Sequence, residues 1–154
     1  MIRGSVMIRV LLVLHALLAM ALAGAMTHLA LVSIGFIRGN RMKLRLGRIY
    51  AITTGVLHLV TAAVGLIIYP PYRFWVAGLY LNRYAVWASN LFDVKEAAAL
   101  FAVPMAVGLI VVGRKFDATD RPAVPAFAFF ALGLWVLDAF AIVAGLLITA
   151  ERGV

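Results

Sequence analysis

Three polar residues lie deep within long apolar stretches and could do chemistry there: His28, His58 and Asp138. Arg38 follows His28 by ten residues, and Arg48 precedes His58 by ten. If two helices meet at this basic segment, each imidazole lies about 15 Å from it, near the middle of a bilayer core about 30 Å thick. Asp138 falls at a similar level, about 18 Å from the same side.

A carboxylate at that depth needs a compensating group. An ionised side chain at the centre of a membrane helix costs about 2.5–3.5 kcal/mol on insertion scales. The apolar stretches hold no lysine or arginine near the level of Asp138. We therefore expect His28 or His58 to pair with this carboxylate, either as an imidazolium or as a neutral ring that donates its N–H.

Four roles fit these residues. The leading prediction is a b-type haem held by His28 and His58 from different helices, with Asp138 orienting one ligand or offsetting charge. One alternative is a proton or ion relay, and another is a bare metal centre of two histidines and one carboxylate. The structural alternative is a polar clamp, in which interhelical hydrogen bonds worth about 0.6–2 kcal/mol each fix the packing.

Small residues share a helical face with each of the three polar side chains. Because small side chains let helices approach closely, this pattern predicts that His28, His58 and Asp138 all point into the bundle. Small neighbours would also leave room for a flat macrocycle. The neighbours are Ala51, Thr54, Gly55, Thr61, Ala62 and Gly65 for His58; Ala21, Gly24, Ala25 and Gly35 for His28; and Ala131, Ala141 and Gly145, with the larger Trp135 beside them, for Asp138.

His15, Arg73 and Arg83 are secondary candidates. His15 precedes His28 by thirteen residues, roughly 20 Å along a helix, so the two cannot ligate one iron. We expect His15 near the level of Pro70-Pro71, either as a satisfied interfacial residue or as a ligand of a second haem or metal completed by a group other than histidine. Arg73 and Arg83 could bind haem propionates, a quinone head group or an acidic patch of a partner.

The composition indicates a membrane protein. Of the 154 residues, 66% are hydrophobic and 13% are charged, and a soluble domain of this size could not bury so much apolar surface. The chain has no cysteine, which excludes disulfides and thiolate metal sites. The net charge of +8 comes mostly from basic residues at the ends of the apolar stretches. Basic residues there set the orientation in the membrane and contact anionic lipid headgroups, so we expect no nucleic-acid partner.

The apolar stretches predict an all-α fold, an integral membrane four-helix bundle of two helical hairpins in a single domain, residues 1–154. The predicted spans cover about residues 8–37, 48–69, 94–113 and 126–149. The first begins like a secretory signal but continues to Ile37, so we expect it to be retained. The second is expected to end at Pro70-Pro71, because proline interrupts helical hydrogen bonding.

The segment between the second and third spans is rich in aromatic residues. Tyr69, Tyr72, Phe74, Trp75, Tyr80, Tyr84, Trp87 and Phe92 alternate there with polar and basic residues. This pattern predicts an amphipathic helix lying at the outer membrane interface. Its role is either that of an aromatic belt that anchors the span ends or that of a lid or docking surface.

The distribution of lysine and arginine predicts the orientation. The first and third loops hold eight such residues, against six on the opposite side, and the first loop alone holds five. We therefore expect those loops in the cytoplasm and both termini outside it, in a bacterial inner membrane. Arg3 and Arg9 taken alone favour the reverse orientation. The eight are Arg38, Arg41, Lys43, Arg45, Arg48, Arg114, Lys115 and Arg121; the six are Arg3, Arg9, Arg73, Arg83, Lys95 and Arg152.

In general plan the chain is similar to small four-helix membrane cytochromes b. This resemblance implies a membrane subunit of a redox assembly that transfers electrons through haem b, with donor and acceptor supplied by other subunits or a quinone. We expect the chain to assemble with other redox subunits or to form a homo-oligomer. Nucleotide-binding and hydrolase motifs are absent at usable spacing, so we expect a subunit more than a stand-alone enzyme. The alternatives are a proton- or ion-conducting protein and an anchor subunit without chemistry of its own.

Overall fold

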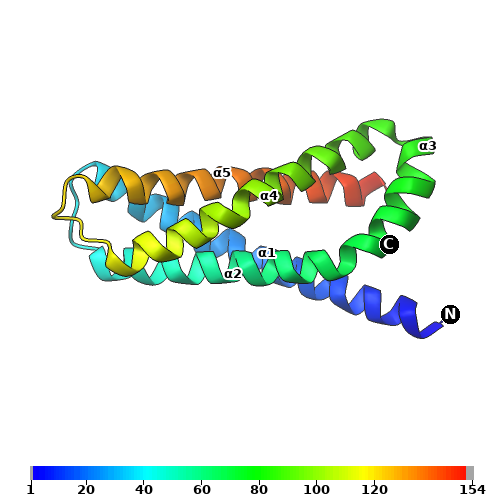
Figure 1. Ribbon diagram of the computed structural model, residues 1–154, viewed down its shortest axis with the longest axis horizontal. Coiled ribbons are helices and arrows are strands. Elements are labelled where there is room, and N and C mark those ends of the chain that lie inside the picture. The colour runs from blue at the N-terminus through cyan, green and yellow to red at the C-terminus, as the bar shows by residue number, and fades with distance from the viewer. Residues whose placement is uncertain (1, 152–154) are drawn as a thin grey trace.

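The computed structural model describes residues 2–151, and the side chains of residues 6–151. All regular structure in that range is helical, and four of the helices are long and apolar enough to cross a membrane. The chain is therefore an all-helical membrane protein, as its composition predicts (Figure 1). In order, the elements are α1 (Ile2–Ile37), α2 (Leu44–Tyr72), the π-helix η1 (Arg73–Leu81), α3 (Asn82–Tyr84), α4 (Val86–Lys115) and α5 (Ala123–Glu151).

The helices extend beyond the predicted spans at most of their ends. The clearest case is α4, which begins at Val86 where the apolar pattern predicts a start near Val94. Hydropathy marks only the part of a helix that lies in hydrocarbon. The backbone hydrogen bonds of the helix continue along polar segments such as that of Asp93 and Glu96, because a helix satisfies its own amide groups whether or not lipid surrounds it.

The prediction that Pro70-Pro71 ends the second span is wrong. Both prolines lie inside α2, which continues to Tyr72 and runs directly into η1. Proline removes a backbone donor and crowds the preceding turn. The wider i→i+5 bonding of the π-helix that follows directly is one way for a helix to absorb such a disturbance. The chain bends here and crosses the end of the bundle towards α4 (Figure 1).

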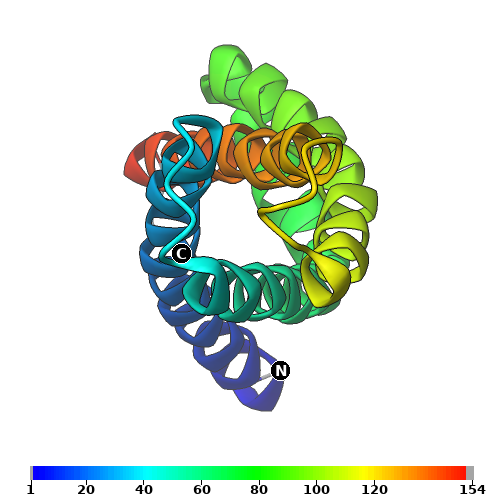
Figure 2. The ribbon, with the colours of Figure 1, turned by 90° about the vertical axis from the view of Figure 1, so that its left-hand side faces the viewer.

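The four long helices form a ring. α1 packs against α2 and α5, and α4 packs against the same two helices. Figure 2 shows this ring from the end that carries the first and third loops. Helices α2 and α5 thus lie diagonally across the bundle, so a contact between them must pass through its centre.

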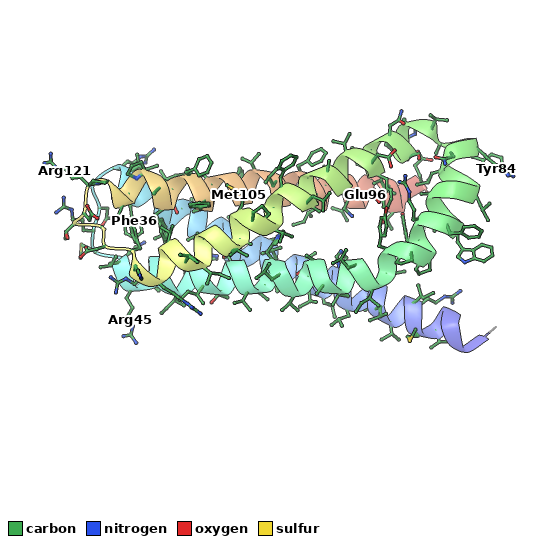
Figure 3. The ribbon with its side chains drawn as sticks, viewed as in Figure 1. Phe36, Arg45, Tyr84, Glu96, Met105 and Arg121 are labelled. Atoms are coloured by element: carbon green, nitrogen blue, oxygen red, sulfur yellow. The ribbon has the colours of Figure 1, made fainter. Side chains whose placement is uncertain are left out.

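The end with these two loops is closed by aromatic side chains. Phe116 stacks on Phe127 with ring centroids 4.0 Å apart, and Phe36 lies 5.0 Å from Phe116 (Figure 3). Arg48 ties the loops together by donating its Nε–H to the carbonyl of Phe116 at 2.7 Å. Gly39, at a φ of 83°, supplies the left-handed turn that follows α1, a conformation that favours glycine.

Candidate functional site

A direct hydrogen bond joins His58 on α2 to Asp138 on α5. The Nδ1 atom of His58 lies 2.8 Å from Oδ1 of Asp138. Both residues are buried, at 5% and 4% exposure. This bond links the two diagonal helices through the centre of the ring. The predicted pairing of Asp138 with a histidine is therefore present, and His58 is that histidine.

The chemistry of the bond sets the roles of the remaining atoms. An ionised carboxylate can only accept, so His58 donates from Nδ1, and Nε2 of the neutral ring is then a bare acceptor. Neither Nε2 of His58 nor Oδ2 of Asp138 has a hydrogen-bond partner among the described residues, and both atoms are buried. The pair thus combines one hydrogen bond with two further proton acceptors, Nε2 of His58 and Oδ2 of Asp138.

The sequence pattern around His58 explains why it faces inward. The buried face of α2 consists mainly of small or hydroxyl-bearing residues, as predicted. Two of them pack directly against α4: a methyl group added to Gly55 would lie 2.5 Å from Cγ1 of Ile110, and one added to Gly113 would lie 2.7 Å from Ala51. The buried residues of α2 are Gly47, Ala51, Thr54, Gly55, His58, Thr61 and Ile68.

His28 does not join this pair, so the prediction that it points into the bundle is wrong. Its side chain is exposed on the outside of α1. Its Nδ1–H donates to the carbonyl of Gly24 at 2.8 Å, and its ring stacks on Tyr50 with centroids 5.5 Å apart. Tyr50 lies eight residues before His58 on α2, so the two histidines differ in level by about 12 Å.

Two physical features account for this error. The turn after α1 lies closer to His28 than a symmetric arrangement requires, because α1 ends at Ile37 and the chain turns at Gly39. A shift of the turn by one residue changes the register of paired helices by two. In addition, α1 buries mainly large side chains, such as Leu29 and Phe36, while the small residues around His28, Gly24 among them, face outward or lie at the edge.

His15 lies nearer to His58 than its position in the sequence predicts. Its Nδ1–H donates to the carbonyl of Thr61 at 3.1 Å, and a methyl group on Gly65 would lie 3.2 Å from its ring. These residues are three and seven positions beyond His58, or about 5–10 Å along α2. The expected level beside Pro70-Pro71 is therefore wrong, and His15 lies between that end and the central pair.

Arg73 and Arg83 lie at the η1 end of the molecule, apart from His58. Both side chains are exposed. Arg73 forms an ion pair with Asp93 and lies 3.7 Å from Glu96. Fifteen residues separate Arg73 from His58, or about 22 Å along a helix. Neither arginine is therefore placed to hold the propionates of a haem bound at His58.

Polar residues of α4 lie between the η1 end and the His58–Asp138 pair. Lys95 is partly buried, with Nζ 3.3 Å from the position of a methyl group on Gly145 of α5. Oε1 of Glu96 is buried and has no hydrogen-bond partner among the described residues; Figure 3 shows this residue at the η1 end. The packing of α4 against α5 turns part of this group inward.

The residues present do not fit a haem held by two histidines of one chain. No group of three or more histidine, aspartate or glutamate residues in the described part of the chain could hold a metal ion. His58 supplies one ligand nitrogen, while His28 and His15 lie at other levels. The space that small residues would leave beside His58 is filled, since Ile110 packs against Gly55. Neither His58 nor Asp138 lines the cavities of about 200 and 180 Å³, and His28 lines only the first of them.

No protein-family model, curated protein or solved structure matches this chain. A fold of four membrane helices hosts many activities and does not by itself imply one. The chemistry of the His58–Asp138 pair is therefore the basis on which a function can be inferred.

Proposed function

We propose that this integral membrane protein transfers protons through the His58–Asp138 pair. The observation that carries the proposal is the 2.8 Å bond between two buried titratable side chains, each with a second buried polar atom that has no partner among the described residues. A purely structural clamp gains most when every buried polar atom is satisfied. Ionisable residues inside membrane bundles are typical of proton pathways.

The proposed transfer needs only the two side chains. A proton binds Nε2 of His58 and converts the ring to imidazolium. The Nδ1 proton then moves along the 2.8 Å bond to Asp138, which leaves a neutral histidine and a neutral carboxylic acid. Asp138 passes the proton on, and the imidazole ring must exchange its two nitrogens by rotation before it accepts the next proton.

Protons are proposed to reach the pair from the η1 end. His15, Lys95 and Glu96 place polar atoms between that end and His58. The opposite half is filled by an apolar core that ends in the aromatic cluster of Phe36, Phe116 and Phe127. Release towards the loops therefore requires this half to open, and we expect transfer to be slow compared with an open channel.

The placement in the membrane is part of the same proposal. The loop end carries the dense basic segment, so we place it in the cytoplasm of a bacterial inner membrane, with the termini and η1 outside. Residues 73–84, with exposed Phe74, Trp75 and Tyr84, then lie at the outer interface as the predicted amphipathic segment. The two pairs α1–α2 and α4–α5 correspond in this proposal to the two predicted hairpins.

Replacing Asp138 by asparagine tests the proposal. An asparagine keeps an oxygen that accepts the His58 Nδ1–H, so the fold should survive, but it cannot take up a proton. We expect Asp138→Asn to lower proton flux into liposomes about a hundredfold or more, in the range that loss of a proton-transfer group produces. The flux is measured with a pH-sensitive dye inside the liposomes under a valinomycin-clamped potential.

Ser33→Ala is the matched control, because it removes a buried hydroxyl that only bonds to the Leu29 carbonyl of its own helix. It should leave the flux unchanged. The proposal is wrong if the wild type shows no flux above protein-free liposomes, or if Asp138→Asn conducts as well as wild type.

Electron transfer through haem remains a second candidate, because one observation favours it. In many metal sites a carboxylate binds one ring nitrogen of a histidine and orients the other towards the metal. Asp138 holds Nδ1 of His58 in this way and leaves Nε2 bare. In this candidate His58 is the single ligand from this chain, and the second ligand comes from a partner subunit or a second copy. The side chains packed beside His58, Ile110 among them, must then move to admit the macrocycle.

The haem candidate predicts a spectrum that depends on one histidine only. In membranes that hold the protein with its partners, a dithionite-reduced minus oxidised absorbance band should be lost in His58→Ala and kept in His28→Ala. The exposed position of His28 is the reason for the difference. A wild-type protein without the band, or a band lost equally in both variants, would contradict this assignment.

A further inference from the structure

A groove on the outside of the loop end combines an apolar floor with a basic rim. It has a volume of about 200 Å³ and is lined by His28, Leu31, Val32, Gly35, Asn40 and Lys43. The residues from α1 cover seven positions, or about 10 Å along the helix. The groove thus runs from the first loop down the outer surface of α1 and ends at His28.

The glycine in this groove leaves it open. Apart from its chain neighbours and the backbone of its own helix, no described residue has an atom within 4 Å of the position that a methyl group on Gly35 would occupy. Leu31, which precedes it by one turn, is 65% exposed. His28 forms the deep end, held in place by its bond to Gly24 and its stack on Tyr50. The floor is therefore apolar, accessible and rigid.

The rim carries positive charge that the described chain does not neutralise. Residues 38–48 include five lysines and arginines and no acidic residue. Lys43 forms no ion pair with any described residue. The neighbouring loop holds two acids, Asp117 and Asp120, and neither forms an ion pair with Lys43. Two donors of Thr119 hold Asp117 and lower its pKa, and its charged neighbours are Arg48 and Arg41. Lys43 thus remains available to an anion from outside the chain.

We infer that this groove binds one anionic phospholipid, with the phosphate at Lys43 and an acyl chain along Leu31 and Gly35 towards His28. A diacyl phospholipid has this arrangement of charge and apolar length. A basic residue near the membrane surface favours anionic lipid over a neutral one. The site lies apart from the His58–Asp138 pair and does not depend on proton transfer.

Native mass spectrometry of the purified full chain tests this inference. The protein is taken from nanodiscs that contain equal amounts of phosphatidylglycerol and phosphatidylcholine with the same acyl chains. We expect one retained phosphatidylglycerol per chain in excess over phosphatidylcholine. Lys43→Gln should lower that preference about fivefold, the effect of one basic residue at a membrane surface. Arg45→Gln removes the same charge two residues further along, in the first turn of α2 and outside the lining of the groove, and it should change the preference less than Lys43→Gln does.

Gly35→Leu tests the floor of the groove, and Gly24→Leu is its control, because a side chain at either glycine meets open space. Only Gly35→Leu should abolish retention of the lipid. The inference is overturned if the two lipids are retained equally, if Lys43→Gln and Arg45→Gln act alike, or if Gly35→Leu retains lipid as the wild type does. A wild-type dimer that Gly35→Leu dissociates would assign the groove to a second copy and also overturn it.

Discussion

His58→Phe should destabilise the folded protein by about 3 kcal/mol, because it leaves Asp138 buried without its donor. Breaking a buried pair by removing one partner costs about 3–5 kcal/mol in soluble proteins, and an uncompensated carboxylate in a membrane helix costs about 2.5–3.5 kcal/mol on insertion scales. Phenylalanine has nearly the shape of histidine, so the packing between α2 and its neighbours should change little. Equilibrium unfolding in detergent micelles measures the loss.

Removal of both partners should restore most of that stability. The double variant His58→Phe/Asp138→Leu replaces the pair by apolar groups and leaves no buried polar atom unpaired, an exchange that is often neutral or stabilising. Asp138→Leu alone should cost less than His58→Phe, because a neutral imidazole is cheaper to bury than a carboxylate. Additive losses in the double variant would show that the two side chains are not coupled and would contradict the observed bond.

The double variant also separates the structural role from the proposed one. A clamp only fixes packing, so a stable apolar replacement should be as functional as the wild type. If the double variant is stable but conducts no protons, the pair acts through its titratable groups. If it conducts like the wild type, proton transfer through the pair is wrong even though the bond exists.

Gly55→Leu should destabilise the contact between α2 and α4 by about 3 kcal/mol or more, at the upper end of the usual cost of overpacking. The first side-chain carbon at this position would lie 2.5 Å from Cγ1 of Ile110 and 3.0 Å from the carbonyl oxygen of Ala106. The backbone oxygen cannot move away without a shift of α4. The thermal unfolding midpoint in detergent measures the effect.

Gly24→Leu is the matched control, because it makes the same substitution in a membrane helix where no atom lies within 4 Å. It should leave the midpoint nearly unchanged. Adding Ile110→Ala to Gly55→Leu should recover part of the loss, since it removes the side-chain clash but not the close carbonyl. Equal midpoints for Gly55→Leu and Gly24→Leu would contradict the packing described for α2.

The pattern of small residues predicted the orientation of His58 on α2 correctly and that of His28 on α1 incorrectly. On α2 this pattern identified the buried face correctly, and His58 lies on it with Gly55. On α1 the same rule failed, because Leu29 and Phe36 fill the interior and Gly24 faces outward. A stripe of small residues shows that something can approach the helix closely. It does not show whether that object is another helix of the chain, a lipid or a partner.

The class of protein and the residues to be tested follow from the amino-acid sequence. Uninterrupted apolar stretches of this length are typical of membrane helices, and an ionised carboxylate such as Asp138 within one of them is costly without a partner. These statements depend on transfer energies along the chain, which composition and spacing fully specify.

The identity of the partner histidine, in contrast, follows only from the packing of the helices. The choice between His28 and His58 depends on where the first loop turns and on how each helix is rotated about its axis. A turn displaced by a few residues moves His28 about 12 Å from the level of His58, while rotation exposes it on the outer surface of α1. Both quantities are fixed by the interdigitation of side chains from several helices, such as Ile110 against Gly55, and no local pattern encodes them.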